Sequence, residues 1–355
     1  MHYYAYRNLL HLGWDRHWLI AGLWVLALLV PVIRFAHLKW KNAFLEGFYW
    51  IGAIWAGALF MLNFWFWIAN IFRSIFHHFH LEIASDPGPW VATAFSAVIL
   101  MTIWGFISVK RGPFHVNFSL DRSKRYGKNQ SLRLVQISDV HLGITLGIPF
   151  LEKLVKRMNA LEPDLVLITG DFFDPEFSHD LAASETLKKI ISREGVFAVS
   201  GNHEFYAGLP RFTAMMDQGG VHVLNNETKI TKSGLQVSGI HDRTAKRFPH
   251  FGVVSDLDKA IASIDSNAPS ILLAHQPKNF ESAIAKKVDV IFSGHTHGGQ
   301  IFPFRFLVSM VFKYLSGLYP LGEHTQLIVN SGTGFWGPPL RVATESQIVV
   351  VDLKF

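Results

Sequence analysis

The chain shows two kinds of hydrophobic pattern, and the change between them falls near Lys110. Before this point, long apolar stretches with almost no charge run over residues 18–33, 48–71 and 90–109. After it, short apolar runs of four to six residues alternate with polar segments, at 132–137, 165–169, 196–200, 270–273 and 288–292. Long apolar stretches are typical of membrane-spanning helices, and short runs between polar segments are typical of buried strands. The pattern predicts a membrane part followed by an α/β domain.

The first apolar stretch is short enough to be read as the apolar region of a signal peptide. No small-residue cleavage pattern follows it, and the segment 34–39 is typical of a loop at a membrane edge. The second stretch is apolar around its whole circumference, whereas helices of soluble proteins usually keep a polar face. The third ends at a basic pair, Lys110-Arg111. We therefore expect residues 1–115 to form a membrane domain with about three transmembrane helices.

The distribution of Lys and Arg predicts the orientation of this membrane domain, because short cytoplasmic loops carry an excess of these residues. The loop between the first two stretches contains Arg34, Lys39 and Lys41. The next loop has only Arg73, beside two acidic residues, and six basic residues follow the third stretch: Lys110, Arg111, Arg122, Lys124, Arg125 and Lys128. This bias predicts an integral membrane protein with its C-terminal domain in the cytoplasm. The polar, turn-rich segment 116–131 is expected to be a linker to a domain at 132–355.

Polar motifs follow each of the five predicted strands, at the place where ligands gather in open α/β sheets. In chain order they are Asp139-Val140-His141, Gly170-Asp171-Phe172-Phe173-Asp174, Gly201-Asn202-His203-Glu204, Ala274-His275-Gln276-Pro277 and Gly294-His295-Thr296-His297. A two-metal site needs a bridging carboxylate, since one carboxylate can hold a cation with each oxygen, and Asp171 is the natural bridge. In an extended segment, residues two apart point to the same side, so the paired ligands of the first and last motifs are expected to face the metals together.

In this order the motifs resemble the calcineurin-like metallophosphoesterase superfamily, over residues 132–355. The resemblance implies a four-layer α/β sandwich of two mixed sheets flanked by helices, and two divalent ions (manganese, iron or zinc). One ion would be held by Asp139, His141, Asp171 and His297, and the other by Asp171, Asn202, His275 and His295. His203 would be the catalytic group that protonates the leaving oxygen, with Asp174 fixing its tautomer. The resemblance also implies a hydroxide between the metals as the nucleophile, and a phosphoester substrate.

Further features bear on the substrate. Protein phosphatases of this superfamily carry Arg after the second Asp of the Gly-Asp motif, where this chain has Pro175-Glu176. The run 294–300, the segment 332–341 and the membrane helices resemble a branch that contains membrane-associated phosphodiesterases and transmembrane proteins with a metallophosphoesterase domain. This branch is similar to some UDP-diacylglucosamine pyrophosphatases. We expect hydrolysis of a phosphodiester or pyrophosphate bond in a membrane lipid or lipid precursor. A phosphomonoesterase acting on a soluble nucleotide or sugar phosphate, or a catalytically idle membrane scaffold, remain alternatives.

Three segments near the C-terminal end have two interpretations each. Gly299 and Gln300 either contact substrate or form a tight turn, and the Gly-rich segment 331–336 is either part of the rim of the site or a structural loop. The segment 301–319 is strongly apolar, with two basic residues as its only charges. It either dips into the bilayer beside the site or packs as an ordinary helix under the domain.

Composition restricts the remaining possibilities. The chain has no Cys, so a metal site must use His, Asp and Asn, and thiolate zinc sites and Cys nucleophiles are excluded. The net charge of +6 is spread along the chain and forms no basic stripe, so we expect no nucleic-acid partner. Isolated His residues in a soluble domain are usually not ligands, and we leave five of them outside the site: His179, His222, His241, His250 and His324.

Overall fold

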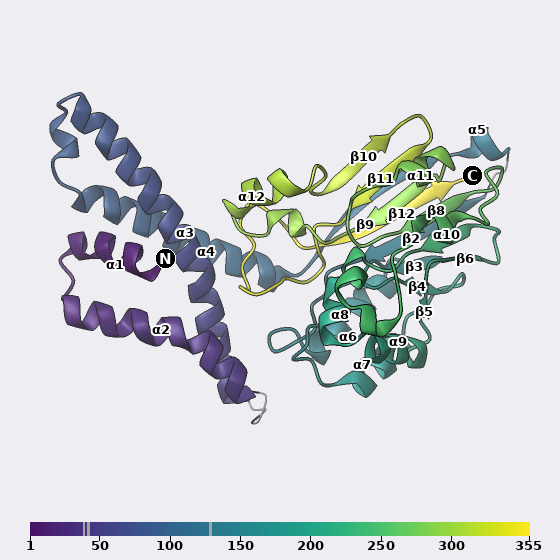
Figure 1. Cartoon of the computed structure of the whole chain (residues 1–355), viewed down its shortest axis with the longest axis horizontal. Coiled ribbons are helices and arrows are strands. Elements are labelled where there is room, and N and C mark those ends of the chain that lie inside the picture. Colours follow the sequence, from purple (N-terminus) through teal and green to yellow (C-terminus); the bar gives the residue numbers. More distant parts are fainter. Residues whose placement is uncertain (38–39, 41–42, 128–129) are drawn as a thin grey trace. The chain divides into compact units, whose positions relative to one another are not determined.

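The computed structural model describes residues 1–37, 40, 43–127 and 130–355 (Figure 1). These residues form two compact units. Unit 1 comprises Met1–Arg111 together with two segments from the C-terminal part, Ile301–Phe304 and Trp336–Ala343. Unit 2 comprises Gly112–Gln300, Arg305–Phe335 and Thr344–Phe355. The chain therefore passes from unit 2 into unit 1 and back twice after the last candidate metal ligand.

Unit 1 is built on the helices α1 (His2–Leu9), α2 (Arg16–His37), α3 (Ala43–His78) and α4 (Gly88–Arg111), with short 3-10 turns at Leu10–Leu12 and Glu82–Ala84. Among the described residues, α2, α3 and α4 are long and apolar enough to cross a membrane. This confirms the predicted spans, although each helix extends beyond its apolar stretch. The helix α1 packs on α3, where Asn70 Nδ2 donates a hydrogen bond of 2.8 Å to Asn8 Oδ1. Lys39 and Lys41, two of the basic residues in the loop between the first two apolar stretches, lie outside the described residues.

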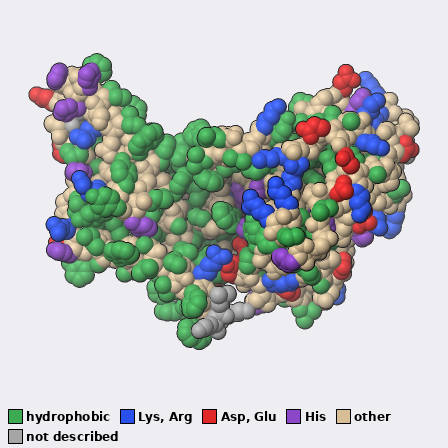
Figure 2. Space-filling view, viewed as in Figure 1, with side chains coloured by type: hydrophobic (Ala, Val, Ile, Leu, Met, Phe, Trp, Pro, Cys, Tyr) green, Lys and Arg blue, Asp and Glu red, His purple; other side chains and the backbone are tan. Residues whose placement is uncertain are grey.

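The two units differ in the side chains that they expose. Hydrophobic side chains cover most of the visible surface of unit 1, whereas Lys, Arg, Asp and Glu gather over unit 2 (Figure 2). Trp18, Trp24 and Leu100 of unit 1 are 82%, 64% and 68% exposed. Large apolar side chains exposed along whole helices are typical of a surface that meets lipid.

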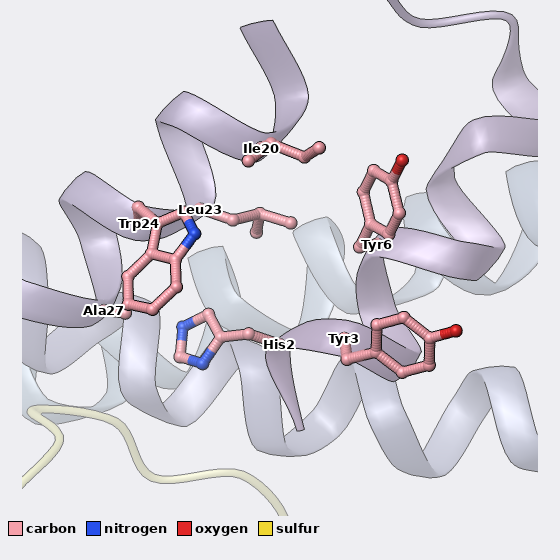
Figure 3. A pocket seen from close by; sticks show the side chains of 7 residues that line it. All are labelled: His2, Tyr3, Tyr6, Ile20, Leu23, Trp24 and Ala27. Atoms are coloured by element: carbon pink, nitrogen blue, oxygen red, sulfur yellow. The ribbon is translucent and has the colours of Figure 1, made fainter. Parts of the chain in front are cut away.

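An open, mainly apolar cavity of about 450 Å³ lies between α1 and α2 (Figure 3). Its lining residues are His2, Tyr3, Tyr6, Ile20, Leu23, Trp24 and Ala27. These aromatic and aliphatic side chains come from helices of unit 1. The lining has no carboxylate, so this cavity does not provide the ligands of the predicted metal site.

Unit 2 contains two six-stranded mixed sheets within its described residues. The first has the order β1-β12-β2-β3-β4-β5, and the second the order β10-β11-β9-β8-β7-β6. The strands of the first sheet are β1 (Phe114–Asp121), β2 (Ser131–Ile137), β3 (Leu165–Ile168), β4 (Val196–Ala198), β5 (His222–Val223) and β12 (Gln347–Lys354). Those of the second are β6 (Glu227–Ile230), β7 (Gln236–Gly239), β8 (Ser270–Leu273), β9 (Val290–Ser293), β10 (Gly317–Leu321) and β11 (Thr325–Val329).

Alternating side chains of the strands place the two sheets face to face. Leu165 and Leu167 of β3 lie in a core shared with Ile271 and Leu273 of β8, whereas Val166 of β3 points to the opposite core. The outer face of the first sheet packs on α6 (Ile148–Asn159), α7 (Asp180–Leu187) and α9 (Leu209–Gln218), and that of the second on α10 (Leu257–Ile261) and α11 (Glu281–Ala285). Strands buried on both faces need continuous apolar sequence, which explains the pattern of β3 and β8. The predicted four-layer sandwich is confirmed.

The segment 116–131, expected to be a linker, contains regular structure. The edge strand β1 pairs in parallel with β12, from Phe114 opposite Gln347 to Asp121 opposite Lys354. The short helix α5 (Ser123–Tyr126) follows, and the Tyr126 hydroxyl donates a hydrogen bond of 2.7 Å to Asp289. The polar residues between Val116, Phe118 and Leu120 make this segment resemble a loop, but such alternation is also the pattern of a strand at a sheet edge. Lys128 lies outside the described residues.

Candidate active site

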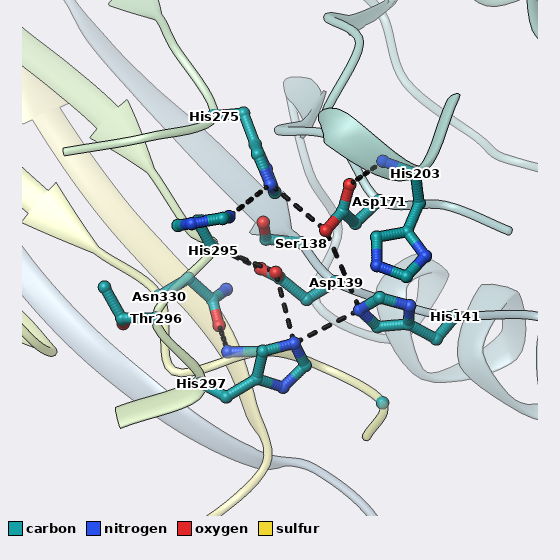
Figure 4. A network of polar contacts seen from close by, with 12 residues as sticks. Ser138, Asp139, His141, Asp171, His203, His275, His295, Thr296, His297 and Asn330 are labelled. Carbon is teal, nitrogen blue, oxygen red and sulfur yellow. Dashed lines mark hydrogen bonds and ion pairs between the residues drawn. The ribbon is translucent and has the colours of Figure 1, made fainter. Parts of the chain in front are cut away.

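The candidate site lies at the carboxyl ends of strands from both sheets. The strands β2, β3 and β4 are parallel neighbours in the first sheet, and β8 and β9 are parallel neighbours in the second. Parallel neighbours end at the same edge of a sheet, so the motif that follows each strand lies next to the others. Figure 4 shows the side chains of the five motifs converging from the two sheets.

Asp139, His141 and His297 form one group of potential ligands, with ligand atoms within 4.8 Å of one another. The Nε2 atoms of His141 and His297 are 3.1 Å apart, and His297 Nε2 lies 3.4 Å from Asp139 Oδ1. Asp139 is buried, and both of its carboxylate oxygens accept from the backbone N–H of His295 at 3.0 Å. The residues predicted to hold the first ion are therefore neighbours in space.

Asp171, His275 and His295 form a second group. His275 Nε2 lies 3.2 Å from Asp171 Oδ2, 3.2 Å from Asn202 Oδ1 and 3.1 Å from His295 Nδ1. Asp171 Oδ2 also lies 3.9 Å from His141 Nε2. One oxygen of Asp171, Oδ2, thus faces residues of both groups, whereas the expected bridge used both oxygens and Oδ1 accepts from the His203 backbone N–H.

The reason expected for the convergence of the paired ligands is wrong. Asp139 and His141 have φ angles of 52° and 49°, and His295 and His297 have φ angles of 71° and 50°, so these residues are not in extended segments. Asp171 is also left-handed, with φ of 50°. Such backbone conformations are uncommon for residues with a side chain and gather at functional sites. Left-handed turns after the strands, rather than strand alternation, direct these side chains to the site.

Gly170 allows two of the motifs to approach each other closely. Its φ is +89°, and a Cβ at this position would lie 2.6 Å from the backbone nitrogen of Gly201 and 2.8 Å from Nδ1 of His275. Any larger residue would push apart the loops that carry Asp171 and Asn202. The glycine of the Gly-Asp motif is therefore required by packing inside the site.

Hydrogen bonds from outside the two groups set the tautomers of two imidazoles. His275 Nδ1 lies 2.8 Å from the carbonyl oxygen of Thr169, and His141 Nδ1 lies 2.8 Å from Asp174 Oδ1. When the ring is neutral, as a metal ligand requires, the acceptor holds its proton on Nδ1 and the Nε2 lone pair faces the site. Imidazole lone pairs and carboxylate oxygens that converge in this way fit divalent cations. The donor set therefore suits the ions that the motifs predict.

His203 forms a third group of potential ligands with His141 and Asp171, and it shares an acceptor with His141. Its Nδ1 is 2.7 Å from Asp174 Oδ1, and its backbone N–H donates to Asp171 Oδ1 at 2.8 Å. Burial disfavours the charged ring, but the carboxylates of Asp171 and Asp174 outweigh burial and raise the pKa of His203 to about 9. Burial opposes ionisation of Asp174 as well, yet the charge of His141 and hydrogen bonds from both rings lower its pKa. The geometry thus provides a proton-carrying imidazole oriented by a carboxylate.

Asp139 and Asp171 are both buried in the site, but their pKa values shift in opposite directions. Desolvation raises the pKa of Asp139. Desolvation also acts on Asp171, but the charges of His275 and His203 and the hydrogen bond with His275 hold its pKa well below the ordinary value. The charges around Asp171, and not its burial, thus decide the direction of its pKa shift.

Glu204 supports the site, although sequence reasoning gave it no role. Its buried carboxylate accepts from the backbone N–H groups of Gly201 at 2.6 Å, Asp171 at 2.9 Å and Phe172 at 2.7 Å. It thereby ties the loop after β3 to the start of α8 (Asn202–Ala207). Burial and the nearby Asp171 charge raise its pKa to about 7. An acidic residue in the first turn of a helix that follows a polar motif was the available signal.

The two Gly-rich segments near the C-terminal end shape the candidate site through their backbone conformation and hydrogen bonds. A Cβ on Gly299, where φ is +85°, would collide with the backbone of Arg305, and the following Gln300 is buried with φ of 45°. These features are those of a tight turn, and contact of Gly299 and Gln300 with substrate stays a prediction. In the other segment, Gly334 N donates to the Asp139 carbonyl at 3.0 Å and Ser138 N donates to Thr333 Oγ1 at 3.2 Å. This loop supports the backbone of Asp139, the first candidate ligand.

The groups of potential metal ligands found among the described residues include none of the five His residues that were left outside the site. His241 is nevertheless buried, with its Nδ1 3.3 Å from Ser200 Oγ, and desolvation lowers its pKa to about 4. It is a neutral His beside the loop that precedes Asn202.

The fold and the ligand groups agree with the comparisons to known proteins. Residues 132–299 match the family described as "Calcineurin-like phosphoesterase". An uncharacterized metallophosphoesterase of Aquifex aeolicus is 31% identical over 259 residues, which cover 70% of this chain and 98% of that protein. The chain therefore belongs to the calcineurin-like metallophosphoesterase family, whose members use dimetal centres to hydrolyse phosphoesters.

A relative named as a transmembrane protein is among the similar proteins. This protein of Danio rerio, "Transmembrane protein with metallophosphoesterase domain", is 33% identical over 284 residues, covering 77% of this chain and 65% of that protein. The chain thus spans less than two thirds of this relative. The solved 5'-nucleotidase precursor of Thermus thermophilus is 17% identical with a TM-score of 0.40, over 63% of this chain and 55% of that one. A likeness at this level carries no argument about substrate.

Proposed function

We propose that this protein is a dimetal hydrolase that cleaves phosphodiester or pyrophosphate bonds in a membrane lipid or lipid precursor. The observation that carries the proposal is the position of Asp171, whose Oδ2 lies 3.2 Å from His275 Nε2 and 3.9 Å from His141 Nε2, one from each ligand group. A carboxylate placed between two sets of imidazoles suits a pair of divalent cations.

In this proposal the two ions have separate ligand sets that share Asp171. Asp139, His141 and His297 complete the first, and Asn202, His275 and His295 complete the second. When bound, such ions polarise a phosphoryl group and lower the pKa of water. His, Asp and Asn ligands suit manganese, iron and zinc alike, so the ligand types do not select one metal. Loading experiments are needed to identify the ions.

His203 is the proposed general acid. A phosphoester bond breaks more easily when the leaving oxygen gains a proton, and His203 holds a proton near neutral pH because two carboxylates favour its charged form. Asp174 keeps the ring oriented through its contact with Nδ1, which leaves Nε2 to face a substrate. Since Asp174 also contacts His141, it orients one proposed ligand and the proposed acid at once.

Two observations support a lipid substrate. Helices long and apolar enough to cross a membrane precede the catalytic unit, and the apolar segment 301–319 begins directly after the last ligands. We also propose a cytoplasmic catalytic unit, from the Lys and Arg that follow α4. Phosphomonoesterase activity on a soluble nucleotide or sugar phosphate is the second candidate, since the ligand set suits mono- and diesters equally.

The test is hydrolysis by the full chain, purified in detergent and loaded in turn with manganese, iron and zinc. The substrate panel contains a phosphodiester, a phosphomonoester and a nucleotide-linked lipid pyrophosphate. We expect turnover with the diester or the pyrophosphate to exceed that with the monoester by at least tenfold. A preference for the monoester would select the second candidate. Two bound ions per chain without turnover of any member would favour an idle site.

Replacing His203 by Asn should reduce turnover without removing the ions. His203 lies outside the two proposed ligand sets, so we expect kcat to fall by about 10²–10⁴-fold, the usual contribution of a general acid. Metal content measured by elemental analysis should stay at two ions per chain. His222→Asn, at a half-exposed position on β5, is the matched control and should leave both values unchanged. Loss of metal in the His203 variant would instead make this residue a ligand.

A further inference from the structure

The helix α12 (Phe304–Val311) exposes an apolar face on unit 2. None of its eight residues, all of them described, is buried. Phe306, Leu307, Met310 and Val311 are 58%, 52%, 81% and 60% exposed. At 100° per residue these four fall within one side of the helix, and Arg305 and Ser309 fall on the other. The interpretation of this segment as a helix packed under the domain therefore does not hold for α12, which is amphipathic with its apolar side uncovered.

The chain enters α12 from unit 1, which contains the long apolar helices. Residues Ile301–Phe304 belong to unit 1, where the Phe302 ring packs against Phe64 and Trp65 of α3, at centroid distances of 5.7 and 6.2 Å. The Phe304 ring, at the first position of α12, packs against Phe60 of α3 at 5.9 Å. The beginning of α12 is thus attached to a helix that is long and apolar enough to cross a membrane.

The chain leaves α12 at the candidate active site. Phe312, the next residue, packs against the proposed metal ligand His295 with ring centroids 4.9 Å apart. The ammonium group of Lys278 lies 4.0 Å from the Phe312 ring centroid. Arg305 and Lys313, which bracket the apolar face, are exposed. Cations around an apolar helical face suit the anionic headgroups and acyl chains of a lipid surface.

We propose that α12 inserts its apolar face into the lipid–water interface and thereby presents the site at His295 to phosphoesters that carry acyl chains. The substrate part of this inference rests on the proposed function, and the membrane contact does not. The lipid bilayer is the occupant that the structure favours over a protein partner, because α12 starts from a residue packed on α3. Its length of about 12 Å suits an element that lies in the interface and does not span it.

The membrane contact is tested without any enzymatic assay. The chain has no Cys, so Met310→Cys gives a single attachment point for an environment-sensitive fluorophore. The labelled full chain is reconstituted in vesicles of phosphatidylcholine and phosphatidylglycerol, with and without bromine on the acyl chains. Ile191→Cys, 71% exposed on unit 2, is the water-exposed control, and Leu100→Cys on α4, 68% exposed, is the lipid-exposed control.

We expect brominated lipid to quench the label at position 310 at least threefold more than at position 191, and to a degree close to that at position 100. Equal quenching at 310 and 191 would overturn the proposal. A blue-shifted emission at 310 without quenching by bromine would assign this face to a protein contact, and would equally overturn the assignment to lipid.

The substrate part is tested with the double variant Leu307→Glu/Met310→Glu in the same vesicles. Turnover of a long-chain phosphodiester in the vesicles is divided by turnover of a water-soluble diester with the same headgroup. We expect this ratio to fall at least tenfold, and to stay unchanged in the control Ile191→Glu. An unchanged ratio in the double variant would refute substrate presentation by α12. Absence of turnover in the unaltered chain would count against the proposed function alone, because the labelling result stands independently.

Discussion

Asp171→Asn should abolish the paired metal site and reduce turnover by roughly 10³-fold or more. Asp171 Oδ2 is the atom that faces ligands of both groups, and an amide in its place carries no negative charge with which to hold two cations. A metal clamp provides several kcal/mol of transition-state stabilisation, and each 1.36 kcal/mol corresponds to about a tenfold change in rate. Elemental analysis should find one ion or fewer per chain, and the rate should not be restored by millimolar metal.

The matched control for this variant is Asp258→Asn, at an exposed position in α10. It makes the same chemical change outside the site, and we expect metal content and rate to equal those of the unaltered chain. If Asp171→Asn retained two ions and full turnover, the assignment of Asp171 as the bridging ligand would be wrong. Thermal unfolding of both variants shows whether any loss of activity reflects loss of the folded state.

Glu204→Ala should lower the stability of the catalytic unit even in the absence of metal. The substitution leaves three buried backbone N–H groups, those of Gly201, Asp171 and Phe172, without their acceptor. Each buried donor without a partner costs about 1–3 kcal/mol, so the unfolding free energy should fall by about 3 kcal/mol or more. For a unit of this size the melting temperature should decrease by about 6–12 °C.

Glu185→Ala is the control for Glu204→Ala, because Glu185 is 56% exposed and pairs with Lys188 on the surface of α7. Exposed ion pairs contribute little to stability, so the melting temperature of this variant should change by less than about 2 °C. Both variants are melted in detergent with chelator present, which separates a packing effect from loss of metal. A melting temperature for Glu204→Ala as high as that of the control would show that water replaces the lost acceptor.

The loop that supports Asp139 continues into the membrane unit. Thr333 and Gly334 bind the backbone of Ser138 and Asp139, and the chain then enters unit 1 at Trp336. There, Arg341 N donates to the carbonyl oxygen of Gly105 in α4 at 3.1 Å, and a Cβ on Gly105 would lie 2.8 Å from the Val342 side chain. Within a few residues, one segment thus supports a proposed ligand and packs on a helix long enough to cross a membrane. A second segment does the same: it begins at the candidate ligand His297 and reaches Phe304, whose ring packs on Phe60 of α3.

The sequence determined the parts of this protein that depend on local pattern and on residue chemistry. Continuous apolar stretches predicted the helices that are long and apolar enough to cross a membrane, since only such helices suit a hydrocarbon core. Apolar runs such as 165–169, each followed by Asp, Asn or His, located the strands and their ligands. These ligand types are few, and their order along the chain was enough to predict a dimetal site and its family.

Only the tertiary structure decided how these pieces are held together. Left-handed turns, such as those at Asp139 and His297, arise from packing that the sequence pattern does not display. The role of Glu204 required the positions of three N–H groups from two separate loops, and the strand β1 required its partner β12 at the far end of the chain. The exposure of the apolar face of α12 could not be predicted from the sequence either, because a buried helix and an exposed helix can have the same apolar sequence. Long-range contacts, and not local preference, decide such features.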